Sequence, residues 1–76
     1  MNQIIAVQPP GRYLVADPAT RLGRVLDTAE RVLYPPSPVD TIASRGYWEE
    51  YDGPQDALSG LLEGVREIAA PEERTR

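Results

Sequence analysis

Two short apolar runs dominate the first sixteen residues of the chain. Residues 3–7 (QIIAV) and residues 12–16 (RYLVA) are both rich in the β-branched and aromatic side chains that favour strands. Between these runs, Pro10 and Gly11 fit the central positions of a type II turn. Because a type II turn matches the twist of a tight hairpin poorly, we expect a connection wider than two residues. The pattern predicts an N-terminal β-hairpin.

The next segment, residues 17–34, carries apolar residues at spacings of three and four, which is typical of one side of a helix. These residues are Leu22, Val25, Leu26, Ala29, Val32 and Leu33. Asp17 suits the N-cap, and Pro18 suits the first helical position, where its missing N–H is harmless. Tyr34 and the two prolines after it would end the helix. The segment therefore predicts an amphipathic helix.

A short helical turn is expected at residues 38–44. Ser37 would be its N-cap, Val39 and Ile42 its buried side, and Gly46 its stop.

A last helix is predicted from residue 54 to about residue 69. Its apolar stripe consists of Leu58, Leu61, Leu62, Val65, Ile68 and Ala69. Gly60 and Gly64 lie beside this stripe, and each costs a helix about 1 kcal/mol relative to alanine. Such glycines call for the close approach of another backbone. We favour the 22–33 helix of the same chain, and the alternative is a homo-oligomer that forms through the Gly60 and Gly64 helix.

These elements predict a small single α+β domain over residues 1–70. In it, the N-terminal β-hairpin packs on two amphipathic helices with a short helical turn between them. Residues 71–76 are polar and are expected to form a flexible tail. We identify no internal repeat.

The composition argues against most kinds of catalysis. The chain contains no His, Cys or Lys, and its eight cations are all Arg. It therefore lacks an imidazole or lysine base, a thiolate nucleophile, and nitrogen or sulfur ligands for zinc. Glycine-rich phosphate-binding motifs are also absent from the sequence. We expect a protein that is not an enzyme and that carries no cofactor and no metal.

The distribution of charge disfavours nucleic acid as a partner. The formal net charge is −4; residues 1–46 hold five Arg against four acids, whereas residues 47–76 hold three Arg against eight acids. Phosphate contacts require a clustered basic face, and acidic residues interrupt the one candidate patch. That patch comprises Arg21, Arg24 and Arg31. The sequence has neither a signal peptide nor an apolar stretch of membrane-spanning length, so we expect a cytoplasmic protein without membrane contact.

An acidic aromatic segment is the candidate partner-binding site. It holds three of the five aromatic residues and consists of Tyr47, Trp48, Glu49, Glu50, Tyr51 and Asp52. Tyrosine and tryptophan bury a large area and keep a polar group, which is typical of interaction hot spots. The alternative for Trp48 is a structural one, because the single tryptophan of a small domain often anchors its core.

Three functional hypotheses follow from these features. We favour a non-enzymatic protein–protein interaction protein that binds a larger protein as an inhibitor, adaptor or structural and assembly subunit. Small proteins of this kind occur among bacterial phage and mobile-element accessory factors. The alternative is an acidic nucleic-acid mimic, in which the carboxylates of residues 49–73 block a basic groove on a partner. The third hypothesis is a carboxylate-based enzyme that uses Glu49, Glu50 and Asp52.

Overall fold

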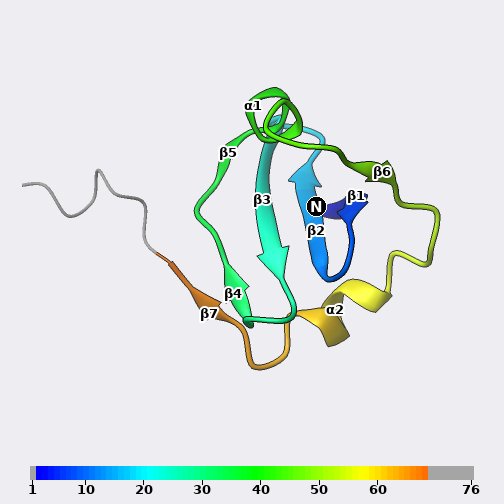
Figure 1. The fold of residues 1–76 in the computed structure, drawn as a ribbon, viewed down its shortest axis with the longest axis vertical. Coiled ribbons are helices and arrows are strands. Elements are labelled where there is room, and N and C mark those ends of the chain that lie inside the picture. Colours follow the sequence, from blue (N-terminus) through cyan, green and yellow to red (C-terminus); the bar gives the residue numbers. More distant parts are fainter. Residues whose placement is uncertain (1, 69–76) are drawn as a thin grey trace, which may run out of the picture.

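A mixed β-sheet organises the chain in the computed structural model, which describes residues 2–68 (Figure 1). Within these residues the sheet has seven strands, and two short helices lie at opposite ends of it. The elements, in chain order, are β1 (Gln3–Gln8), β2 (Arg12–Asp17), β3 (Leu22–Asp27), β4 (Val32–Leu33), β5 (Ser37–Pro38), α1 (Val39–Ala43), β6 (Glu49–Glu50), α2 (Ala57–Leu61) and β7 (Arg66–Glu67).

The strand order is β6-β1-β2-β3-β4-β7, and only the β4–β7 pair is parallel. The three longest strands, β1 to β3, form an antiparallel meander at the centre of the sheet. β4 and β5 both pair with β3. β4 pairs with Leu26 and Asp27, and β5 pairs with Leu22 and Gly23. Residues 34–36 therefore form a break in what is otherwise one neighbouring strand.

The predicted fold class is wrong, and of its elements only the N-terminal hairpin and the short helical turn are present. β1 and β2 form the predicted hairpin, and three residues separate them. Residues 17–34, however, form strands and turns instead of a helix, and the last helix is confined to α2. No pair of long amphipathic helices packs on the hairpin in residues 2–68, because the meander continues through β3 and β4.

Two similar turns explain why the segment 17–34 is not helical. In the β2–β3 turn, Ala19 N–H donates to Asp17 Oδ1 over 3.0 Å, and in the β3–β4 turn Ala29 N–H donates to Asp27 Oδ1 over 3.0 Å. Such local bonds compete with the hydrogen bonds of a helix. Each turn ends in an arginine with a positive φ, 62° and 59° respectively. The pattern Asp-x-Ala-x-Arg recurs ten residues apart, so the sequence does contain a short repeat, at Asp17–Arg21 and Asp27–Arg31.

One face of the sheet carries the main core and is called here the core face. Its buried residues are Ile4, Val15, Leu26 and Leu33. Cross-strand partners lie on the same face of an antiparallel sheet, and the pairs Ile4–Val15 and Leu26–Leu33 follow this rule. The last segment of the chain covers this face through Leu58, Leu61 and Val65. These three residues were predicted to be on the buried side of a long helix; they are partly buried, but the helix ends at Leu61.

The opposite face, called the second face, is only half covered. α1 lies over the half that contains Leu14 and Gly23: a Cβ atom added to Gly23 would meet Leu14 Cδ1 at 3.0 Å and Val39 Cγ2 at 3.1 Å. Ile42 is buried and Val39 half-buried, which agrees with the predicted inner side of this helix. The predicted N-cap at Ser37 is wrong, because Ser37 belongs to β5 and Pro38 caps α1 without a side-chain hydrogen bond.

The two glycines of the last segment do not form a common helical strip. Gly64 follows the end of α2 and adopts a φ of 72°. Glycine adopts this angle more readily than other residues, so the backbone conformation accounts for Gly64 without the close approach of another backbone. A Cβ atom added to Gly60 would meet nothing within 4 Å. Their predicted packing against a helix at residues 22–33 is therefore wrong, and a homo-oligomer through this segment stays a prediction.

Two further predictions concern the membrane and the ends of the chain. Neither helix in residues 2–68 has the length and apolar character needed to cross a membrane. The predicted tail at residues 71–76 and the predicted end of the last helix at residue 69 lie outside the described residues.

Candidate functional site

The uncovered half of the second face is hollowed into two adjoining depressions. They measure about 190 and 490 Å³ and share four residues, Arg12, Val25, Ile42 and Arg45. Gln8 and Trp48 complete the first depression, and residues 34, 35 and 37 complete the second. We call this continuous hollow the groove. Its lining residues are Gln8, Arg12, Val25, Tyr34, Pro35, Ser37, Ile42, Arg45 and Trp48.

One wall of the groove is the break between β4 and β5. Tyr34 N–H still donates to Val25 O over 2.9 Å, and Arg24 Nε donates to Tyr34 O over 2.7 Å. Pro35 and Pro36 have no N–H to offer to β3, so the chain pairs again only at Ser37. The result is that Tyr34 and Pro35 stand beside Val25, which lies in the floor.

The other wall is the segment that leads from α1 to β6. Gln8 Nε2 donates to Tyr47 O over 3.2 Å, and Arg12 Nη1 donates to Gln8 Oε1 over 3.5 Å. A Cβ atom added to Gly46 would lie only 2.9 Å from Gln8 Nε2, so a larger residue here would displace the Gln8 amide from this wall. These contacts hold Trp48 at the edge of the groove, where its side chain is half-buried.

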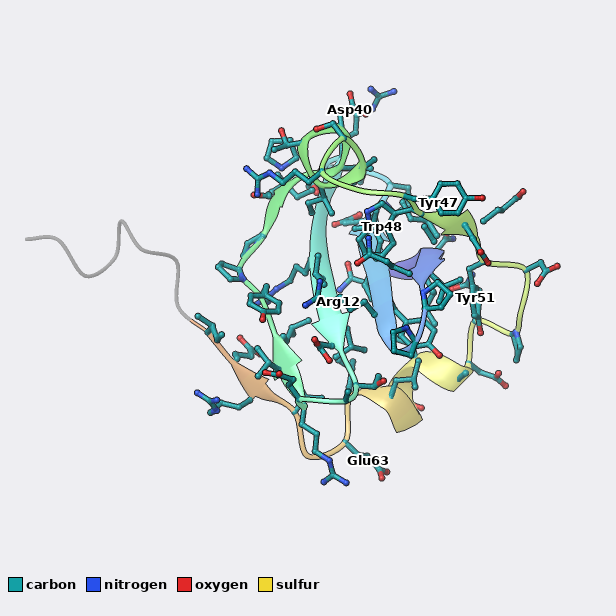
Figure 2. All side chains as sticks on the ribbon, viewed as in Figure 1. Arg12, Asp40, Tyr47, Trp48, Tyr51 and Glu63 are labelled. Carbon is teal, nitrogen blue, oxygen red and sulfur yellow. The ribbon has the colours of Figure 1, made fainter. Side chains whose placement is uncertain are left out.

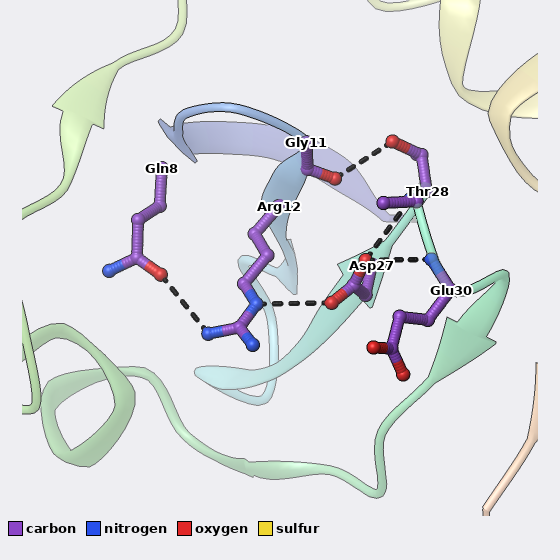
Figure 3. A network of polar contacts seen from close by, with 7 residues as sticks. Gln8, Gly11, Arg12, Asp27, Thr28 and Glu30 are labelled. Carbon is purple, nitrogen blue, oxygen red and sulfur yellow. Dashed lines mark hydrogen bonds and ion pairs between the residues drawn. The ribbon is translucent and has the colours of Figure 1, made fainter.

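A buried carboxylate fixes Arg12 in the floor (Figure 3). Asp27 Oδ2 accepts from Arg12 Nε over 3.1 Å, and Asp27 Oδ1 accepts from the N–H groups of Ala29 and Glu30, each over 3.0 Å. The Glu30 N–H contributes most to lowering the pKa of Asp27; Arg12 and Ala29 lower it further, and burial opposes them. Asp27 is therefore ionised at neutral pH, and its carboxylate forms an ion pair with the guanidinium group of Arg12.

The structure separates the six predicted partner-binding residues (Figure 2). Trp48 lines the groove, whereas the adjacent Tyr47 is 76% exposed and does not line it. Glu49 and Glu50 form the short strand β6, paired with β1, and both are exposed. Asp52 is also exposed.

Tyr51 lies on the other side of the sheet from the groove. Its ring meets Tyr13 edge-on at 6.2 Å between centroids, and it packs against the buried cluster of the core face. Its hydroxyl donates to Pro54 O over 2.7 Å. The aromatic residues of the predicted site thus divide between the two faces, with Trp48 in the groove and Tyr51 against the core. Their role in partner binding stays a prediction, as does the acidic mimic.

Sequence reasoning missed most of the groove. Arg12, Val25 and Arg45 come from separate parts of the chain, and only the strand register brings them together. The repeated Asp-x-Ala-x-Arg turns were the usable signal, because they place Arg12, Leu14 and Val25 on one face of a meander.

The lining of the groove suits binding. It offers indole, phenol, aliphatic and guanidinium groups, which can make stacking, apolar and charged contacts. In residues 2–68 no cluster of three His, Cys, Asp or Glu residues is placed to hold a metal ion. No protein-family model, curated protein or solved structure that was compared with the chain matches it. The interpretation of the groove therefore depends on its geometry.

Another hollow, of about 490 Å³, lies at the opposite end of the second face. It is lined by residues of β1, of the β2–β3 turn and of the start of α1, among them Ile5, Asp17 and Val39. No aromatic side chain lines it, so it lacks the broad rigid surfaces that Trp48 and Tyr34 give to the groove.

Proposed function

We propose that this chain is a small non-enzymatic protein–protein interaction protein and that its groove takes a segment of a larger protein. The observation that carries this proposal is the position of Trp48, half-buried at the wall of an open apolar hollow. A tryptophan held in this way presents a large, rigid surface at little cost in conformational entropy. Such a protein serves as an inhibitor, an adaptor or an assembly subunit.

The shape of the groove suits an extended peptide. Its floor is formed by the central strands β2 and β3 together with Ile42 of α1, and its walls come from the two irregular segments around Tyr34 and Trp48. Binding residues on loops that a rigid scaffold supports are a common arrangement. Alternate side chains of an extended peptide point to the same side, so two adjoining depressions can take two of them.

The test is a native pull-down from the source cell with the wild-type chain, Trp48→Ala and Tyr47→Ala. Tyr47 is the matched control, because it is the neighbouring aromatic residue and lies outside the groove. We expect Tyr47→Ala to retain the partner and Trp48→Ala to lose about tenfold or more in affinity, which is typical of a hot-spot residue. Circular dichroism must show that both variants fold. Unchanged partner binding by a folded Trp48→Ala variant would contradict the proposal.

A further inference from the structure

We propose that the segment bound in the groove is acidic, with carboxylates on either side of an apolar residue. This inference depends on the proposed function, because it names the chemistry of the partner that the groove would take.

The charge of the groove is opposite to that of the chain. Arg12 and Arg45 are the only charged residues among its nine lining residues, although the whole chain has a formal net charge of −4. Both arginines line both depressions, so they lie where the depressions meet. The acidic residues of β6, Glu49 and Glu50, do not line the groove. A ligand with negative charge is therefore complementary to this surface.

The two arginines differ in how far their charge is already compensated. Arg12 is paired with Asp27, yet 51% of its side chain remains exposed. Within residues 2–68, Arg45 forms no ion pair and no side-chain hydrogen bond, and it is exposed. Arg12 is thus held in a fixed orientation, and Arg45 supplies the charge that no acid of the described fold offsets.

The apolar part of the groove determines the second requirement on the ligand, an uncharged side chain that can be buried there. Trp48 and the Tyr34–Pro35 wall lie on either side of Val25 and Ile42, which form an apolar floor. A side chain without charge can bury its surface there, while carboxylates two residues before and after it, on the same side of the extended segment, reach the guanidinium groups. Arginine binds carboxylates strongly because its donors match both oxygens. An extended acidic segment with a proline, leucine or aromatic residue meets both requirements.

Selection from a random peptide library on the immobilised chain tests this inference. We expect the selected peptides to be enriched in Asp and Glu two residues away from an apolar residue, the spacing that places both side chains on one side of an extended peptide. A labelled peptide from this set should bind Arg45→Glu about tenfold more weakly than wild type in an anisotropy titration, since a favourable charge becomes repulsive. Arg66→Glu makes the same change of charge on the exposed strand β7, outside the groove, and should alter the affinity less than about twofold.

A charge swap makes the test more specific. Exchanging the acidic residues of the peptide for lysines should abolish binding to the wild-type chain and restore binding to Arg45→Glu. Selected peptides without acidic residues that still require Trp48 would overturn this inference and leave the proposed function intact. Peptides that bind a folded Trp48→Ala variant as tightly as wild type would overturn both. Tighter binding of a phosphopeptide or a single-stranded oligonucleotide than of any acidic peptide would also overturn the inference.

Discussion

Asp27 shows how one residue supports both the fold and the candidate site. It is only 5% exposed, and a buried carboxylate is tolerated only when it is paired and hydrogen-bonded. One of its oxygens closes the β3–β4 turn and the other holds Arg12 in the groove. The turn and the orientation of Arg12 therefore depend on the same charge.

We predict that Asp27→Asn lowers the free energy of unfolding by about 1 to 3 kcal/mol at neutral pH, the usual cost of breaking a buried charged hydrogen bond. The pKa of Asp27 is lower in the folded chain than its ordinary value of 3.8. Its stabilising effect is therefore fully present above pH 3.8 and is lost as the pH falls through the folded pKa. The difference between wild type and variant should shrink correspondingly in urea unfolding curves recorded at decreasing pH.

Asp56→Asn is the matched control for this experiment. Asp56 is exposed and makes no side-chain hydrogen bond as the cap of α2, so its exchange should leave stability within about 0.5 kcal/mol of wild type. A difference between wild type and Asp27→Asn that stays constant down to pH 2 would show that the charge of Asp27 is not what stabilises the turn.

At the scale of elements, the free edge of β1 is closed by a side chain. Ile4 N–H donates to Gln55 Oε1 over 2.7 Å, and Gln55 Nε2 donates to Ile4 O over 2.8 Å. The amide thus replaces a neighbouring strand where β6 does not reach, since β6 pairs only with Ala6 and Val7. Unpaired strand edges favour association with other chains, and Gln55 blocks this one.

We predict that Gln55→Ala destabilises the chain by about 1 to 3 kcal/mol, because both backbone groups of the buried Ile4 lose their partner. The opened edge should also increase self-association. Urea unfolding and light scattering at increasing concentration measure the two effects. Gln3→Ala is the control: Gln3 is an exposed glutamine on the same strand, and its loss should change neither quantity. Wild-type stability in Gln55→Ala would show that water replaces the amide without cost.

The hairpin is predicted correctly because residue propensity and the connecting residues indicate the same structure. The β-branched runs of β1 and β2 and the proline–glycine connection identify the hairpin without help from distant residues. Leu22, Leu26 and Leu33, in contrast, fit a helical stripe as well as they fit strands joined by four-residue turns. The decision between these alternatives came from hydrogen bonds of Asp17 and Asp27, which periodicity does not reveal.

At the scale of the whole molecule, the two faces of one sheet differ in how far they are covered. The core face is covered by the last segment of the chain and holds the buried cluster, whereas half of the second face stays open as the groove. The aromatic composition of residues 47–52 identified Trp48 as a candidate partner-binding residue. The remaining groove residues were not predicted, because strand register determines which face each one occupies, and a helix assigned to residues 17–34 gives no register.

This difference between the faces, together with the proposed function, predicts opposite consequences for two neighbouring residues of β3. Leu26 is fully buried on the core face, so Leu26→Ala should cost about 2 to 5 kcal/mol, a large part of the stability of a small domain. Val25 is half-buried in the groove floor, and Val25→Ala should cost about 1 kcal/mol or less.

For peptide affinity we expect the reverse order, with the larger loss in Val25→Ala and the smaller in Leu26→Ala. Val25→Ala removes apolar floor from the groove and should weaken a selected peptide several-fold, whereas Leu26→Ala, assayed at a temperature where it remains folded, should bind almost as wild type does. Thermal unfolding and anisotropy titration of the two variants measure both quantities. Equal losses of stability at the two positions would mean that the second face is as much a core as the first, and the groove would then be a packing defect instead of a binding surface.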